Sequence, residues 1–178
     1  MPELQVLRRQ HFGASDFAFP ITATFLKNSA ARGVQLEISA RLTFPQFRTG
    51  RFGLRVLANA SSSAGSTTEA EYTEVGFERT ANHSRVFVDR RRSSGGVRDA
   101  DVRSGPWVPS GSLTNLHLFV DRSIVTLIAD NVTSISVWVH PTDVAASERV
   151  ALFSSVRGVK AERIDVWQLA DGGAVLAK

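Results

Sequence analysis

The sequence contains no cysteine, and only three of its basic residues are lysines: Lys27, Lys160 and Lys178. Without thiols there are no disulfides, no cysteine nucleophile and no thiolate ligands for zinc or iron–sulfur clusters. No apolar run approaches the roughly 20 residues of a membrane-spanning helix, so no membrane partner is expected. The opening residues, MPELQ, lack the apolar core of a signal peptide. With 178 residues, 43% of them hydrophobic and 21% charged, the chain is predicted to form a single globular domain over residues 1–178.

The net charge of +4 comes mainly from arginine, and the densest basic run is Arg90-Arg91-Arg92. A nucleic-acid-binding module interleaves such a run with aromatic residues that stack on bases. Here the aromatic residues occur in strand-like patterns instead. We therefore expect a solvated or salt-bridged arginine loop, and no nucleic-acid partner.

Alternation with period two dominates the chain. In the segment 34–44, VQLEISARLTF, every second residue is apolar, which predicts a strand with one buried face and one face in solvent. On this reading Glu37 belongs to the solvent face. Further strands are predicted at 52–58, 72–78, 84–89, 113–120, 123–129, 135–140, 150–154 and 159–169.

Two segments rich in turn-forming or small polar residues, 59–68 and 93–109, are predicted to be loops. The segments 29–33 and 142–147 could each form a single helical turn. Many short strands without long helices predict an all-β fold, either a sandwich or a barrel. Of these, the resemblance described below implies two antiparallel sheets packed as a β-sandwich of the jelly-roll or lectin-like type.

Catalytic and metal-binding patterns are sparse. The four histidines are far apart and lack metal-ligand spacing, so neither a metal site nor a cofactor is predicted. A glycosidase needs two carboxylates flanking the scissile bond. The aspartates at predicted strand ends or in loops are Asp89, Asp99, Asp101, Asp121 and Asp130. Turn capping is the favoured role for them, and no catalytic residue is assigned.

Tryptophans and asparagines are the remaining candidates for contact with carbohydrate. Trp107 follows a Ser-Gly-Pro turn and is expected to be the most exposed tryptophan, which makes it a weak candidate for stacking on sugar. Trp138 and Trp167 lie within predicted strands and could be core residues. The N-x-S/T glycosylation sequons are at Asn59, Asn82 and Asn131. They favour a secretory origin.

Several ordered segments resemble one family. They are 88–94 (VDRRRSS), 118–125 (LFVDRSIV), 137–142 (VWVHPT) and 164–169 (IDVWQL). Together they resemble the C-terminal β-sandwich of glycoside hydrolase family 32, which includes invertases, inulinases, levanases and fructosyltransferases. The matching motif positions, expected to be structural, are Asp89, Arg90, Arg92, Ser93, Asp121, Ser123, Pro141 and Trp167. Residues 1–10 resemble the passage that links the family's catalytic domain to its sandwich.

The chain departs from the family pattern at two places. Thr126 stands where the family has glutamate after D-x-S-I-V, which puts in question a contact toward the neighbouring domain. Ala129-Asp130-Asn131 replaces an Asn/Gln-Gly-Gly hairpin.

The resemblance implies that catalysis belongs to an N-terminal five-bladed propeller, with N-D-P, R-D-P and E-C motifs. None of these motifs occurs in the sequence, and Arg98-Asp99-Ala100 does not match R-D-P. The chain is therefore expected to be a non-catalytic module that packs on the propeller and stabilises it. Such a module should expose an apolar patch when isolated. The alternatives are a stand-alone lectin-like domain that binds fructan or another glycan, and a domain that self-associates as a homodimer.

Overall fold

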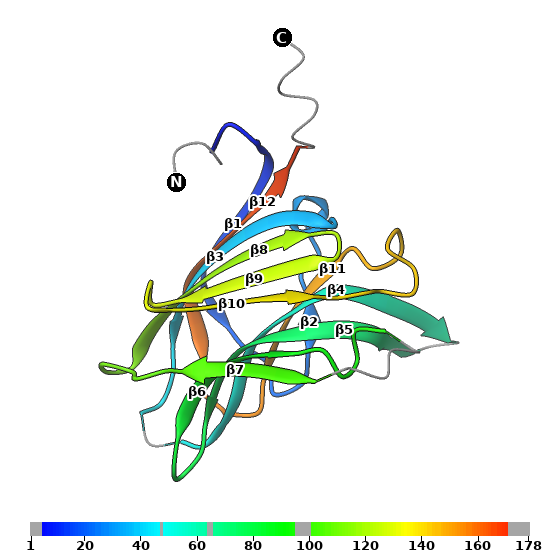
Figure 1. The fold of residues 1–178 in the computed structure, drawn as a ribbon. Coiled ribbons are helices and arrows are strands. Elements are labelled where there is room, and N and C mark those ends of the chain that lie inside the picture. The colour runs from blue at the N-terminus through cyan, green and yellow to red at the C-terminus, as the bar shows by residue number, and fades with distance from the viewer. Residues whose placement is uncertain (1–4, 47, 64–65, 95–100, 171–178) are drawn as a thin grey trace.

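The computed structural model describes residues 5–46, 48–63, 66–94 and 101–170. Its strands form two six-stranded antiparallel sheets, which lie one above the other in Figure 1. Sheet A has the order β1 (Arg8–Ala18), β12 (Lys160–Leu169), β3 (Gln35–Thr43), β8 (Leu113–Asp121), β9 (Ile124–Ala129), β10 (Thr133–Trp138). Sheet B has the order β2 (Thr24–Phe25), β11 (Arg149–Ser154), β4 (Gly50–Ser63), β5 (Ser66–Arg79), β6 (Ser84–Asp89), β7 (Val102–Pro106). The predicted all-β sandwich is confirmed.

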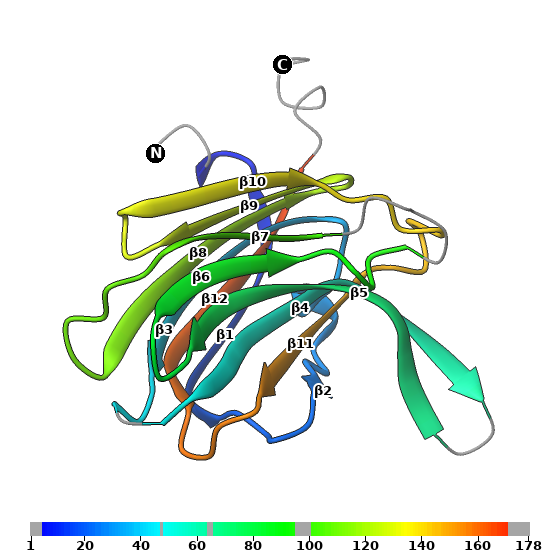
Figure 2. The same cartoon turned by 60° about the horizontal axis from the view of Figure 1, so that its bottom comes forward.

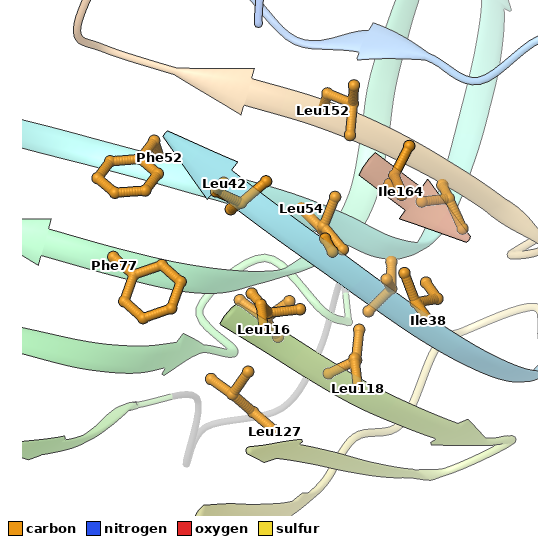
Figure 3. Packing of buried hydrophobic residues seen from close by; sticks show 14 of the residues in the cluster. Ile38, Leu42, Phe52, Leu54, Phe77, Leu116, Leu118, Leu127, Leu152 and Ile164 are labelled. Carbon is orange, nitrogen blue, oxygen red and sulfur yellow. The ribbon is translucent and has the colours of Figure 1, made fainter. Parts of the chain in front are cut away.

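The core lies between the two sheets and follows the alternation of the sequence. In β3, the side chains of Leu36, Ile38 and Leu42 are at most 1% exposed. Figure 3 shows Ile38 and Leu42 among side chains from β4, β8 and β12, including Leu54, Leu118 and Ile164. Burying a side chain of this size contributes about 1.5–3 kcal/mol. The sheets are therefore held together mainly by apolar burial, as period two predicts.

The predicted loop at 59–68 is wrong. β4 continues to Ser63 and β5 begins at Ser66, and their register is regular from Ala60↔Glu69 to Ser63↔Ser66. In Figure 2 this hairpin extends away from the rest of the sandwich. Backbone pairing therefore extends both strands through a segment whose sequence lacks apolar alternation.

Two edge strands also differ from the prediction. β7 lies inside the predicted loop 93–109 and pairs with β6 from Asp89↔Val102 to Arg85↔Pro106. β1 was not predicted, because most of its residues are exposed and show no buried face. Edge strands of this kind are set by pairing with a neighbour, so their own sequence carries little signal.

The only helix in the described part of the chain is the 3₁₀ helix η1 (Ser29–Ala31), within the predicted turn at 29–33. The Asn28 side chain caps it by accepting a hydrogen bond from the backbone N–H of Ala30, at 2.8 Å. Residues 142–147 form a hydrogen-bonded turn instead. The described residues include no helix of a length and hydropathy that would cross a bilayer.

Candidate functional site

The outer face of sheet B is hollow at its centre, where Gly53 of β4 lies opposite Gly76 of β5. A Cβ atom on Gly53 would come within 2.1 Å of the Val75 carbonyl oxygen, so no larger residue fits. Phe153 and Phe87 pair with the two glycines from the neighbouring strands. The result is a shallow trough between two aromatic rings.

Arginine side chains cover this trough. The guanidinium carbon of Arg51 lies 3.9 Å from the ring centre of Phe87, which is fully buried. That of Arg55 lies 5.4 Å from the ring centre of Phe153 and 4.1 Å from that of Tyr72. Cation–π contact and apolar covering together keep water from both phenylalanines.

The same arginines bind the carboxylates of the outer face, and we call this group the sheet B cluster: Arg51, Arg55, Glu74, Asp89 and Arg91. Arg51 Nη2 lies 3.1 Å from Asp89 Oδ2 and 3.4 Å from Glu74 Oε2. Arg55 Nη2 lies 2.9 Å from Glu74 Oε1, and Arg91 Nη2 lies 2.6 Å from Asp89 Oδ2. Burial opposes ionisation of Asp89, but hydrogen bonds from Arg91 and Arg51 outweigh it and lower the pKa of Asp89.

A cavity of about 310 Å³ lies beside this cluster and is lined by Arg51, Tyr72, Glu74, Asp89, Arg91 and Arg92. Its two carboxylates are ion-paired to arginines. The Tyr72 ring lies between the guanidinium groups of Arg55 and Arg92, and its hydroxyl accepts a hydrogen bond from Arg92 at 3.0 Å. A general acid needs a raised pKa, whereas that of Asp89 is lowered. The carboxylates that line the cavity are thus paired with arginines.

The outer face of sheet A carries a second charged group, the sheet A cluster: Arg8, His11, Glu37, His117 and Asp165. Glu37 accepts two hydrogen bonds from Arg8, at 2.7 and 2.6 Å, and its Oε1 lies 2.9 Å from His117 Nε2. His11 Nε2 lies 2.9 Å from Asp165 Oδ1. Since Arg8 and His11 belong to β1, these contacts pin the edge strand to the sheet.

Glu37 corrects the predicted solvent face of β3, because it is only 2% exposed. It pairs in register with Trp167 of β12 and Phe119 of β8, and Arg8 closes over it. Burial disfavours its charge, but hydrogen bonds from Arg8 and His117 outweigh burial and lower the pKa of Glu37. For Asp165 the hydrogen bond from Arg163 is the main cause of a lowered pKa, against partial burial.

The tryptophan prediction is wrong for Trp107. Its side chain is 5% exposed and packs against Phe44 and Phe77, at 5.1 and 4.7 Å between ring centres. Its indole N–H donates to Asp130 Oδ2 at 3.2 Å, which allows this polar edge to be buried. Trp138, at the end of edge strand β10, is the exposed tryptophan, at 61%.

The two open edges of the sandwich differ. Between β1 and β2 lies a mainly apolar groove of about 590 Å³, lined by Phe12, Phe17, Thr24, Phe25, Leu26, Lys27 and Asn28. Between β7 and β10 lies a more polar groove of about 480 Å³, lined by Arg90, Arg103, Ser104, Ser134, Ile135, Ser136, Val137 and Trp138.

The family model for the C-terminal region of glycosyl hydrolases family 32 matches residues 3–168. The chain belongs to this family. A comparison with curated protein sequences finds no match.

Solved structures of family 32 enzymes share the fold. Fructan 1-exohydrolase IIa from Cichorium intybus superposes with a TM-score of 0.76 at 16% identity, over 96% of this chain and 37% of that one. β-Fructofuranosidase from Aspergillus kawachii gives a TM-score of 0.67 at 21% identity, over 93% and 29%. Sucrose-6-phosphate hydrolase from Lactobacillus gasseri gives 0.65 at 16% identity, over 94% and 30%. The chain spans about a third of the length of these proteins.

The family motif at 89–93 joins three strands. Asp89 accepts a hydrogen bond from the backbone N–H of Arg91 at 3.1 Å, and the Ser93 hydroxyl donates to the Arg90 carbonyl at 2.7 Å. Arg90 Nε donates to Asp101 at 3.0 Å, and its Nη1 donates to the Trp138 carbonyl at 2.7 Å. Arg90 therefore connects the end of sheet B to the last strand of sheet A. These contacts favour the structural role predicted for the motif.

The position of the missing family glutamate, Thr126, lies on the outer face of sheet A. Thr126 Oγ1 and Ser136 Oγ are 2.9 Å apart on neighbouring strands. The short Thr126 side chain therefore contacts its neighbour on β10, whereas the longer side chain of a glutamate would extend away from the sheet.

Of the other motif residues, only Trp167 contacts one of the two clusters, the sheet A cluster, where Arg8 lies 3.9 Å from its ring centre. Asp121 is exposed and accepts from Gln35 Nε2 at 3.2 Å. The Ser123 carbonyl accepts from the backbone N–H of Val139 at 2.8 Å. Pro141 is buried, and Trp167 stacks on His11 with ring centres 5.1 Å apart.

The remaining aspartates and sequons are placed as follows. Asp130 accepts hydrogen bonds from the Thr114 hydroxyl and the Asn115 backbone N–H, at 2.8 and 2.7 Å, so its donors lie on the neighbouring strand β8 and not in the turn that it was predicted to cap. Asp99 lies outside the described residues. Asn59 is half-buried in β4, whereas Asn82 and Asn131 are exposed in turns. Among the described residues, no three histidine or acidic side chains are grouped to hold a metal ion.

Proposed function

We propose that this chain is the non-catalytic C-terminal sandwich of a β-fructosidase-like protein, and that it packs on an N-terminal catalytic domain and stabilises it. The observation that carries the proposal is the family match over 3–168, in a chain that spans about a third of related enzymes. The remaining two thirds of those enzymes are available to hold the active site.

The absence of catalytic function is supported by sequence and charge pairing. The sequence has no N-D-P, R-D-P or E-C motif. The carboxylates most buried in the two clusters, Glu37, Asp89 and Asp165, all have a lowered pKa, so they are suited to ion pairs rather than to donating a proton.

The docking surface we propose for the catalytic domain is the β1–β2 edge. The groove there is lined by three phenylalanines, and Phe17 and Ile21 are 38% and 50% exposed. β1 is an 11-residue edge strand, a length that proteins usually cover because unpaired strand edges aggregate. As β1 is the first strand of a C-terminal module, a preceding domain would join the chain beside it.

The docking test compares the full-length protein carrying Phe17→Ser and Ile21→Ser with the unaltered one. Covering these side chains stabilises the complex, so the double variant should lower the unfolding temperature of the catalytic domain and its activity on sucrose. The control is Val132→Ser, which is 85% exposed at the far edge of sheet A and should change neither. The proposal would be refuted if the catalytic domain kept its unfolding temperature and activity in the double variant, or in a protein from which the 178-residue sandwich is deleted.

Two measurements on the 178-residue chain complete the test. Incubation with sucrose should release no fructose, and release would contradict the non-catalytic assignment. Light scattering should show a monomer, or weak association that Phe17→Ser abolishes. A tight dimer formed through this edge would identify a second copy as the partner instead.

A further inference from the structure

The β7–β10 edge has an unusual exposed side chain. Trp138 is 61% exposed and ends the edge strand β10, and it lines the groove of about 480 Å³. An exposed indole loses the favourable burial that a large aromatic side chain normally gains. Its surroundings therefore decide whether it is an incidental surface residue or one that receives a ligand.

The surroundings of Trp138 are rich in hydroxyl groups. Ser134 and Ser136 lie on the same face of β10 as Trp138, four and two residues before it, and both line the groove with Ser104 of β7. Arg103 also lines the groove, and its Nε lies 2.7 Å from Asp101 Oδ2. Serine hydroxyls and a guanidinium group can form hydrogen bonds with the hydroxyls of a sugar, and the indole ring can stack on the apolar face of its ring.

The groove is held in a defined shape. Arg90 donates to the Trp138 carbonyl at 2.7 Å and to Asp101 at 3.0 Å, which ties the end of β10 to the start of β7. The Thr133 hydroxyl donates to the Pro106 carbonyl at 2.7 Å at the opposite ends of the two strands. A site already held open by its own hydrogen bonds loses little conformational entropy when a ligand binds.

The charges and apolar content of the groove select the class of ligand. Asp101 pairs with both Arg90 and Arg103 and so compensates one of their two charges, and the other polar side chains of the groove are uncharged serine hydroxyls, which suit a ligand rich in hydroxyl groups. Unlike the β1–β2 groove, with its three phenylalanines, this one offers a single aromatic ring among serines. That composition suits a sugar better than the apolar surface of a protein.

We propose that the β7–β10 groove is a binding site for a short neutral oligosaccharide, with one sugar ring stacked on Trp138 and the hydroxyls of that ring and of the neighbouring sugar units bonded to Ser134, Ser136, Ser104 and Arg103. That the sugar contains fructose rests on the proposed function. The site would hold substrate chains near an attached catalytic domain, and it needs no chemistry of its own.

The test is calorimetric titration of the 178-residue chain with 1-kestose, and with maltotriose as a glucose-only control. We expect saturable binding of 1-kestose. Trp138→Ala should weaken it by about tenfold or more, and Trp138→Phe should restore part of the loss. Ser136→Ala should weaken it less. Val6→Ala, a change to an apolar residue that is 61% exposed and lies just before β1 at the opposite edge of sheet A, should leave it unchanged.

Each alternative result overturns the proposal. Absence of saturable binding, or binding that Trp138→Ala leaves intact in a folded protein, refutes the site. Preferential binding of maltotriose that depends on Trp138 refutes the fructose-containing ligand. None of these results bears on docking, which is measured by the stability of the catalytic domain without added sugar, so the two proposals fail independently.

Discussion

Ion pairs between basic side chains and carboxylates occur on the outer faces of both sheets, but they have different structural roles. On sheet B, arginines pair with carboxylates over the Gly53–Gly76 trough at the centre of the sheet, and Arg51 and Arg55 have side chains only 26% and 20% exposed. On sheet A, one pair joins the central strands β3 and β8, and two others fasten the edge strand β1, where Arg8 is 27% exposed and His11 43%. On sheet B two largely buried arginines cover aromatic rings, whereas on sheet A the ion pairs hold an edge strand in place.

The largest effect is expected at the centre of sheet B. Gly53→Ala would place a methyl group 2.1 Å from the Val75 carbonyl oxygen, which is backbone and cannot move without opening the β4–β5 ladder. We expect a loss of about 3 kcal/mol or more, a fall in unfolding temperature on the order of 10 °C. Calorimetry measures it.

The matched change on sheet A is Gly13→Ala. The nearest atoms to its new Cβ are side-chain atoms of Asp165 and His11, both at 3.1 Å, and these can shift. We expect well under half the destabilisation of Gly53→Ala. Equal losses of stability would mean that the backbone contact at Gly53 is no more costly than the side-chain contacts at Gly13.

A smaller effect is expected from neutralising the carboxylates of sheet A. Glu37→Gln removes the negative charge and replaces one of the two oxygens that accept from Arg8 with an NH2 donor, at a site 2% exposed, and should reduce stability by about 2 kcal/mol. Asp165→Asn should cost about 1 kcal/mol or less, because its main partner Arg163 is largely in solvent. Urea denaturation of both variants measures the difference, and the reverse order would contradict the importance of burial here.

The smallest change in folding stability is expected when the pH is lowered moderately. Glu37, Asp89 and Asp165 each have a pKa lowered in the folded chain, so each contributes stability that is complete above its ordinary pKa. That stability should decline as the pH falls below about 4.5 for Glu37 and about 3.8 for the aspartates, and continue to decline through the lower folded values. Urea midpoints between pH 6 and pH 3 should fall less for Glu37→Gln than for the unaltered chain. If the urea midpoints of the variant and the unaltered chain fell equally, Glu37 would not contribute to the loss of stability in acid.

Much of the sandwich can be predicted from the sequence because each central strand carries its own alternation of apolar and polar residues. The strand predicted at 84–89 matches β6, and the core residues of β3 follow from period two alone. β1 and β7 escaped prediction because an edge strand is stabilised by its neighbour's backbone, which no local pattern records.

The candidate sites depended more on tertiary structure. Trp107 was expected at the surface from its turn, but Asp130, 23 residues away, satisfies its indole N–H and lets it join the core. Trp138 was ambiguous within its strand, and only the position of β10 at the sheet edge exposes it.

The sequence by itself determined the all-β class, the family and the central strands, because alternation and motif order are local properties of the chain. Tertiary structure alone decided that Glu37 is buried, that Arg90 joins the two sheets, and that the two edges carry grooves of different character. Burial and ion pairing depend on which strands become neighbours. That choice is made by the whole chain, since most of these partners lie tens of residues apart.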